Sequence, residues 1–149
     1  MAQKFKIEGL KELEEALQEL PKATGKNVLK RALMDAGQPV LDAARSAAPQ
    51  LSGALQRSHT VGTKLTRSQK KENTPESTVE VYVGPSGLVQ AITQEFGTRV
   101  APAQPFMRPA WDANKVRALL MVRDSLADEI EKARARLARK AARLLAKTG

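Results

Sequence analysis

The feature that most constrains the fold is the C-terminal stretch from Ala110 to Thr148, which contains neither glycine nor proline. These two residues most often end or break a helix, so the stretch predicts one long helix over about residues 110–147. The segment before it, 97–109, contains three prolines and cannot adopt a regular structure. We therefore expect a long terminal helix that follows a stiff, irregular loop.

Apolar residues at helical spacing predict further helices earlier in the chain. One covers residues 10–20, where leucines face one side and glutamates the other. The next covers residues 22–47, and Pro39 inside it removes one backbone hydrogen bond, which predicts a kink. A shorter helix is expected over residues 88–96. The residues expected to face inward there are Ala91, Ile92 and Phe96.

Alternating apolar and polar residues predict three short strands, near residues 4–8, 58–66 and 77–83. Between the last two, residues 67–77 are polar and without periodicity, which is typical of an exposed hairpin loop. We expect an α+β fold in which a small, mainly antiparallel sheet packs against the kinked second helix and part of the long basic C-terminal helix. A length of 149 residues predicts a single domain, with its compact part over about 4–125.

Composition argues against several classes of function. The chain has no cysteine and a single histidine, His59, so neither a thiolate metal site nor a histidine cluster for zinc can form. We find no phosphate-binding glycine loop and no motif that fixes a nucleophile beside a base, and we expect neither an enzyme nor a cofactor. The sequence has no apolar run long enough for a membrane span and no signal-peptide pattern at its start, so we expect a soluble protein made in a cytoplasm.

The net charge of +9 is unevenly distributed. Residues 1–20 contain three lysines and five glutamates, a balance of 3 − 5 = −2. Residues 113–149 contain ten Lys/Arg and four Asp/Glu, a balance of 10 − 4 = +6. This polarity favours either head-to-tail pairing between copies or contact of one end with an anionic surface, and it does not choose between them.

Basic residues in the last helix recur every three or four positions, so they form one continuous stripe opposite the apolar side. They are Lys132, Arg136, Arg139, Arg143 and Lys147. Three interpretations stay open: contact with DNA passing through a ring, contact with an acidic protein surface, and a solvated face that keeps the protein soluble.

The proline-rich loop that precedes this helix carries Phe106 and Met107 and is followed by Trp111. Stiff backbone and aromatic area are what a docking loop needs, because little conformational entropy is lost on binding. The alternative is that Phe96, Phe106 and Trp111 pack under the sheet and fix the last helix. From these residues alone, packing is the favoured interpretation.

Three blocks of sequence carry a resemblance to a known family. They are residues 9–13, residues 48–58 with Ala-Pro and Ser-Gly-Ala-Leu, and residues 95–110 with Glu-Phe-Gly-Thr and Pro-Ala-Gln-Pro-Phe-Met-Arg-Pro. The chain resembles the HK97 gp10-type family of tailed-phage head–tail joining proteins, and the third block is the most specific. The resemblance spans most of residues 7–115. The basic loop at 67–77 and the chain after about residue 125 fall outside the family's pattern.

The resemblance implies a structural virion protein of the neck or tail end, made in the cytoplasm of a bacterial host. It implies a homo-oligomeric ring that joins the head portal complex to the tail. The implied partners are portal, adaptor or head-closure proteins, tail tube or terminator proteins, and genomic DNA in the lumen; no membrane partner is expected. The alternatives are a tail terminator that caps the tail tube and, in a different class, a basic nucleic-acid-binding regulatory protein, for which no recognition motif is present.

The third block and the residues that follow it supply the predicted contact residues for other subunits or partners. They are Glu95, Phe96, Gly97, Thr98, Arg99, Pro105, Phe106, Met107, Arg108 and Trp111. The basic stripe is the candidate contact with DNA or an acidic partner.

Overall fold

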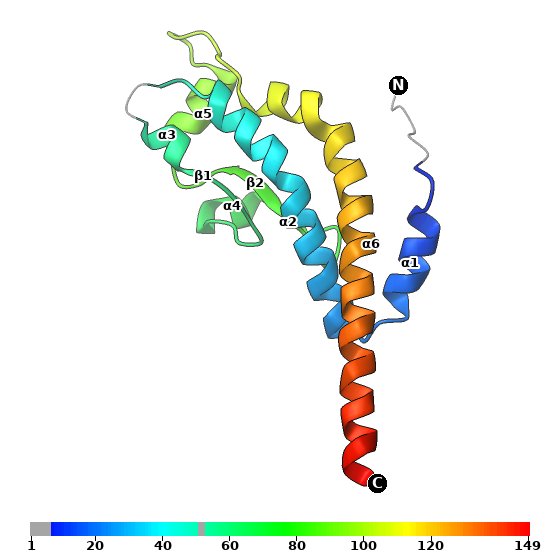
Figure 1. Cartoon of the computed structure of the whole chain (residues 1–149). Coiled ribbons are helices and arrows are strands. Elements are labelled where there is room, and N and C mark those ends of the chain that lie inside the picture. Colours follow the sequence, from blue (N-terminus) through cyan, green and yellow to red (C-terminus); the bar gives the residue numbers. More distant parts are fainter. Residues whose placement is uncertain (1–6, 51–52) are drawn as a thin grey trace.

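The computed structural model describes residues 7–50 and 53–149, and its framework is a pair of long helices lying side by side (Figure 1). A small sheet and three short helices lie beside one of the pair, and a further helix, α1, lies on the other side. The elements in chain order are α1 (Leu10–Gln18), α2 (Lys22–Ala47), α3 (Ala54–Arg57), β1 (His59–Gly62), α4 (Arg67–Glu72), β2 (Tyr82–Pro85), α5 (Val89–Phe96) and α6 (Met107–Thr148).

The α2–α6 pair forms because α2 buries a stripe of small residues along its whole length. Its most buried side chains include Val28, Ala32, Ala36, Val40 and Ala44, spaced by four residues, so they follow one another on one face. Small side chains in this stripe let the backbone of α6 approach closely. The helix continues through Pro39, and the kink that we expect there stays a prediction.

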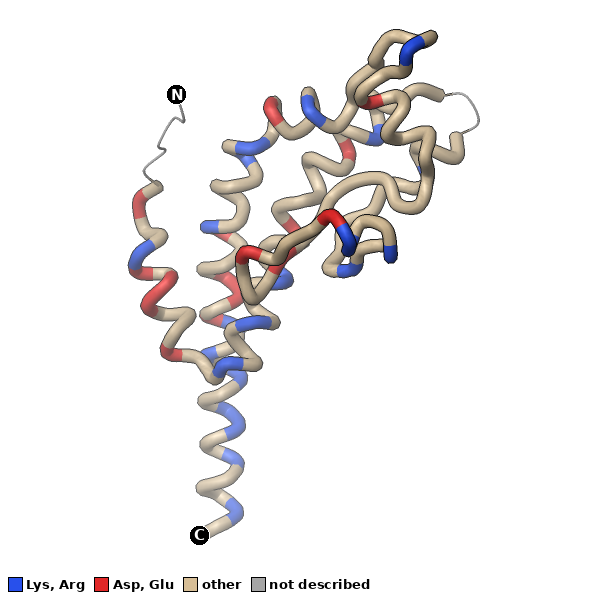
Figure 2. Tube along the Cα trace, turned by 180° about the vertical axis from the view of Figure 1, so that it is seen from behind, with Lys and Arg blue, Asp and Glu red and all other residues tan. Residues whose placement is uncertain are grey.

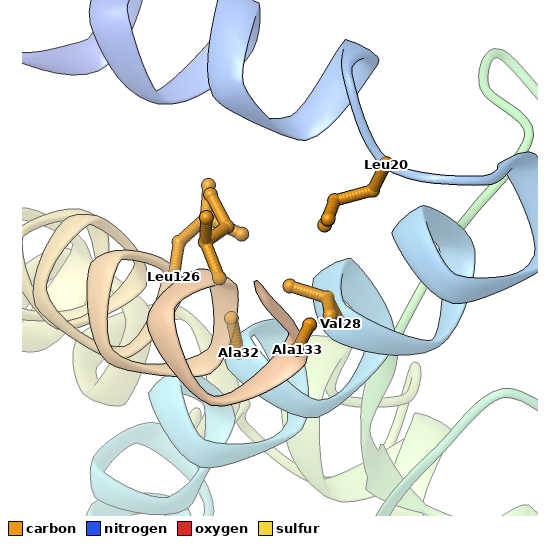
Figure 3. Close-up of a cluster of buried hydrophobic side chains, with 6 residues drawn as sticks. Leu20, Val28, Ala32, Leu126 and Ala133 are labelled. Atoms are coloured by element: carbon orange, nitrogen blue, oxygen red, sulfur yellow. The ribbon is translucent and has the colours of Figure 1, made fainter. Parts of the chain in front are cut away.

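The largest apolar cluster lies where α1, α2 and α6 meet (Figure 3). Leu20, at the corner between α1 and α2, points toward Val28 of α2 and Leu126 of α6. Ile130 of α6 is only 2 % exposed in the same cluster, and the inner face of α1 packs on it through Leu13, Ala16 and Leu17. Burying side chains of this size stabilises the fold by about 1.5–3 kcal/mol each.

The sheet has two antiparallel strands, with Val61 opposite Val83 and His59 opposite Pro85. It contacts α2 at Gly37, where an added Cβ would lie 3.0 Å from Val83 and 3.1 Å from Val61, so a larger residue would push the sheet away. Val83 also packs against a cluster that includes Ala118 of α6. The expected α+β class is therefore confirmed, as is the packing of an antiparallel sheet on the second and last helices.

The strands are shorter than we expected, and the second one begins later. The segment 79–81 was expected inside the strand at 77–83, but β2 begins at Tyr82. The carboxylate of Glu80 accepts hydrogen bonds from the N–H groups of Glu76 and Ser77, at 2.6 and 3.1 Å, and from the Tyr82 hydroxyl. These local bonds compete with strand pairing. Most of the strand expected at 4–8 lies outside the described residues, and Glu8 and Gly9 form a turn.

The expectation of a structureless loop at 67–77 is wrong for its first half, which forms the exposed helix α4. Its cap explains why. The Thr66 hydroxyl accepts from the N–H of Gln69 at 3.3 Å, and the Gln69 side chain accepts from the N–H of Thr66 at 2.9 Å. This reciprocal arrangement is a capping box, and the spacing Thr-x-x-Gln was its visible signal in the sequence.

The other helices lie where the apolar spacing places them. α1, α2 and α5 agree with the predicted ranges to within about two residues, and α6 begins at Met107, three residues earlier than expected. Pro109 is compatible with this early start because the first turn of a helix has no backbone acceptor for the missing N–H. None of the helices in the described ranges is long and apolar enough to cross a membrane.

Candidate interaction surface

The residue that organises the predicted contact region is Glu95, near the end of α5. Its side chain is buried, and its carboxylate points at the N-terminus of α6. One oxygen accepts from the N–H groups of Phe106 and Met107 at 2.8 and 2.9 Å, and the other accepts from the N–H of Arg108 at 3.0 Å. Glu95 therefore caps the long helix from another element and satisfies three backbone donors that have no acceptor within α6.

Electrostatics favour the ionised form of Glu95. Burial alone would raise the pKa of this carboxyl, but donation from the N–H groups of Met107, Phe106 and Arg108 outweighs it and holds the pKa below its usual value. The Arg108 guanidinium contributes in the same direction, since its Nε donates to the carboxylate at 3.0 Å. A negative charge at a helix N-terminus also interacts favourably with the helix dipole.

Gly97 and Thr98 shape the loop that returns the chain from α5 to α6. Gly97 has φ +74° and ψ 176°, a conformation that is open almost only to glycine, and an added Cβ would lie 2.7 Å from the backbone nitrogen of Ala103. The Thr98 hydroxyl accepts from the N–H of Val100 and of Ala101, at 3.3 and 3.1 Å. These bonds fold the loop back on itself before Phe106.

Phe106 is a core residue, since its side chain is fully buried. It packs with Ala44, Leu55, Ala91 and Ala110, and its ring meets that of His59 edge-on, with the centroids 5.3 Å apart. His59 is itself buried, and its Nδ1 donates to the carbonyl of Leu55 at 2.7 Å. Phe106 and Glu95 are thus corrections to the predicted contact set: they lie inside the monomer and hold the surface in place.

In contrast to Phe106, several apolar side chains on the outer side of α5 are exposed. Val89, Ile92 and Phe96 are spaced by three and four residues, and their side chains are 76 %, 63 % and 66 % exposed. The expectation that Ile92 and Phe96 face inward is wrong, because Ala91 and the capping residue Glu95 occupy the inner side. Arg108 lies over the Phe96 ring at 5.0 Å from its centroid, and its guanidinium also donates to the carbonyl of Glu95.

This surface continues across an open groove to Trp111, which is 54 % exposed on the first turns of α6. Ile92 and Trp111 both line the groove, together with Met107 and Leu65. We call Val89, Ile92, Phe96 and Trp111 the apolar surface. Uncovered aromatic and aliphatic side chains next to an arginine are the composition of a protein-binding site.

The remaining predicted contact residues surround this surface. Arg99 and Pro105 are exposed on the loop, as is Thr98. Met107 is half-buried at the groove, and Gly97 is half-buried at the turn. Sequence reasoning missed Val89 and Leu65, although the spacing of Val89, Ile92 and Phe96 on one helical face was a readable signal.

The basic stripe lies on the last turns of α6, which extend beyond the other elements (Figure 2). Lys132, at its start, pairs with Asp128 at 2.7 Å and with Glu129 at 3.7 Å, and the bond to Asp128 raises the pKa of the lysine. The side chains of Arg136, Arg139, Arg143 and Lys147 are exposed, and none of them takes part in an ion pair within the described part of the chain. Four charges of the predicted stripe are therefore open to a partner.

The sequence was compared with family models, curated proteins and solved structures. A model described as "Bacteriophage HK97-gp10, putative tail-component" matches residues 11–97. The match ends at Gly97, so it covers α1 to α5 and leaves out the whole of α6. Neither the curated proteins nor the solved structures gave a match.

Proposed function

The chain belongs to the HK97 gp10-like family of bacteriophage tail components, and on that premise we propose that it joins the head portal complex to the tail as a homo-oligomeric ring. Membership identifies it as a structural phage protein of the virion. The ring, the position at the head–tail junction and the partners are our proposal.

The observation that carries the proposal is the apolar surface. This surface exposes four large apolar side chains, those of Val89, Ile92, Phe96 and Trp111. A monomeric protein rarely leaves so large an apolar patch in contact with water. The backbone beneath them is held by the Glu95 cap and by the fully buried Phe106, so the surface is preorganised and little ordering is needed on binding. A rigid, partly aromatic patch of this kind suits a permanent contact between subunits.

A ring is the assembly that this patch favours. We propose that the apolar surface of one copy contacts a different surface of the next copy, and contacts of this kind end only when a ring closes. The proposed neighbours along the axis are portal, adaptor or head-closure proteins on one side and tail tube or terminator proteins on the other. The exposed basic stripe is the surface that would meet an anionic partner, either DNA in the lumen or acidic protein.

The experiment replaces Ile92 and Phe96 by Gln in a phage that carries no other copy of the chain. Both residues are exposed on a helix and Gln keeps good helix propensity, so the monomer should melt as the parent does. Complete particles should become rarer, while filled heads and free tails accumulate in electron micrographs. Gln90→Ala, on another side of α5, is the matched control and should assemble normally. Normal assembly of the double variant, or imaging that places the chain away from the neck and tail end, would refute the proposal.

A further inference from the structure

The last turns of α6 present two surfaces that nothing in the described part of the chain covers. Every residue from Ala138 to Gly149 is exposed, and Figure 1 shows this end extending past α1 and α2. Leu144 and Leu145, 57 % and 74 % exposed, continue the apolar side of the helix that is buried further up at Ile130. An isolated helix of this length is marginal in water, so a covering partner would stabilise it.

The charge of this end restricts what the partner is. Residues 132–149 contain seven Lys/Arg and no Asp/Glu. The last acidic partners along α6 are Glu131 and Glu19, the residue directly after α1, and both pair with Arg134, at 3.3 and 3.1 Å. Two such ends side by side would repel each other, which argues against pairing between the α6 ends of two copies. The basic stripe therefore calls for an acidic partner.

The acidic complement exists on α1. Its inner face packs on the core, and Glu12, Glu15 and Glu19 lie on the outer face at spacings of three and four residues. Glu12 and Glu15 are exposed and take part in no ion pair within the described residues. Figure 2 shows acidic positions along α1 and basic positions along the free end of α6. The Glu19–Arg134 pair shows that these two helices already make such a contact within one chain.

α6 also exposes apolar residues nearer its start. Val116, Leu119 and Leu120 are 40 %, 37 % and 38 % exposed. Leu119 precedes Leu126 by two helical turns and so lies on nearly the same side of α6, the side that α1 covers further down. The acidic outer face of α1 is therefore the surface of the chain that matches the basic stripe, whereas these exposed apolar residues lie on another element.

We propose that the free end of α6 in one copy binds the α1 side of the next copy, head to tail. Arg139 and Arg143 face Glu12 and Glu15, both pairs being exposed in the single chain. The inference rests on the proposed ring, for which it supplies a second contact between subunits. It names a second copy of this chain as the partner of the basic stripe; DNA is the competing outcome in the test.

The test uses two charge reversals with all substituted residues exposed. Variant one is Arg139→Glu with Arg143→Glu, and variant two is Glu12→Lys with Glu15→Lys. Each is supplied from a plasmid to cells infected by a phage whose own copy is disrupted. Each alone should lower the yield of particles by about tenfold or more, because attraction becomes repulsion. Combined in one chain they should restore it, because the acidic end of each copy then meets the basic α1 of the next. Asp35→Lys with Asp42→Lys, an equal charge change at exposed positions of α2, is the control and should give parental yield.

Each other outcome overturns the proposal in a recognisable way. A loss with variant one alone, while variant two assembles normally, would assign the stripe to DNA or to another protein. A combined variant that stays defective would show that the two surfaces do not meet, and normal yield from both separate variants would show a solvated face. Failure of the parental plasmid to restore particles would count against the proposed function itself, and is therefore distinct from failure of this contact.

Discussion

The two ends of α6 differ in what holds them, and the difference separates fold from assembly. The beginning of the helix is capped by Glu95 from another element, fixed by the fully buried Phe106 and reached through a turn that requires Gly97. At the other end, every residue after Leu137 is exposed in the described structure, and this end carries a dense positive charge. The residues at the first end stabilise the monomer. The second end contributes little to monomer stability and is open to a partner.

In the Glu-Phe-Gly-Thr turn, most of the residues that resemble the family stabilise the fold and do not belong to the exposed contact surface. Glu95, Gly97 and Thr98 make the hydrogen bonds and the backbone conformation that start α6, and only Phe96 projects outward. Conservative changes at the three structural positions should therefore destabilise the monomer before they affect assembly.

Removing the core aromatic should have the largest effect. Phe106→Ala leaves a cavity among tightly packed residues, and the free energy of unfolding should fall by about 3–5 kcal/mol. Phe96→Ala, which removes the same side chain from an exposed position, should cost less than about 1 kcal/mol. Urea denaturation of the two variants followed by circular dichroism measures both. Equal losses in the free energy of unfolding would contradict the assignment of Phe106 to the core and of Phe96 to the surface.

Neutralising the cap should have the next largest effect and should change the pH dependence. Glu95→Gln keeps the shape but replaces a charged acceptor, so we expect a loss of about 1.5–3 kcal/mol at neutral pH. Because the pKa of Glu95 is depressed in the folded state, its contribution is present above the unfolded pKa and is lost as the pH falls through the folded pKa. The parent should therefore lose stability below about pH 4.5, while the variant should lose less over the same range. Parallel pH profiles of the melting temperature would contradict this role.

The turn glycine comes third. Gly97→Ala places a Cβ 2.7 Å from the nitrogen of Ala103 in a region of backbone space that alanine rarely adopts, and should cost about 1–3 kcal/mol. Gly87→Ala is the matched control. Gly87 also has a positive φ, of +73°, but an added Cβ would meet nothing within 4 Å, so only the backbone strain remains. Thermal melts that rank the two variants in the opposite order would show that close approach is not what selects Gly97.

Helix positions could be predicted from the sequence because apolar spacing reports which face is buried, as in the stripe from Val28 to Ala44. The strands near Val79 were predicted less well because local bonds to Glu80 compete with pairing, and a period of two does not reveal such bonds. The prediction of which face of α5 is buried was wrong for a similar reason. Hydrophobicity alone places Ile92 and Phe96 inside, whereas a charged residue, Glu95, takes the inner position because α6 supplies its donors. Which residues of α5 face inward therefore depends on a contact between two segments that are distant in the sequence.

The smallest effect on stability should come from the free end of α6. Changing Arg136, Arg139 and Arg143 together to Gln should alter the free energy of unfolding by less than about 0.5 kcal/mol, since exposed charges contribute little and Gln keeps helix propensity. The same variant should reduce head–tail joining, and the defect should be milder at low salt, where the remaining charges are screened less. Arg31→Gln on α2, which removes an exposed pair with Glu129 at 2.7 Å, is a matched control that should join heads to tails normally. A destabilised triple variant would mean that the free end is part of the fold after all, and the contrast between the two ends of α6 would then be lost.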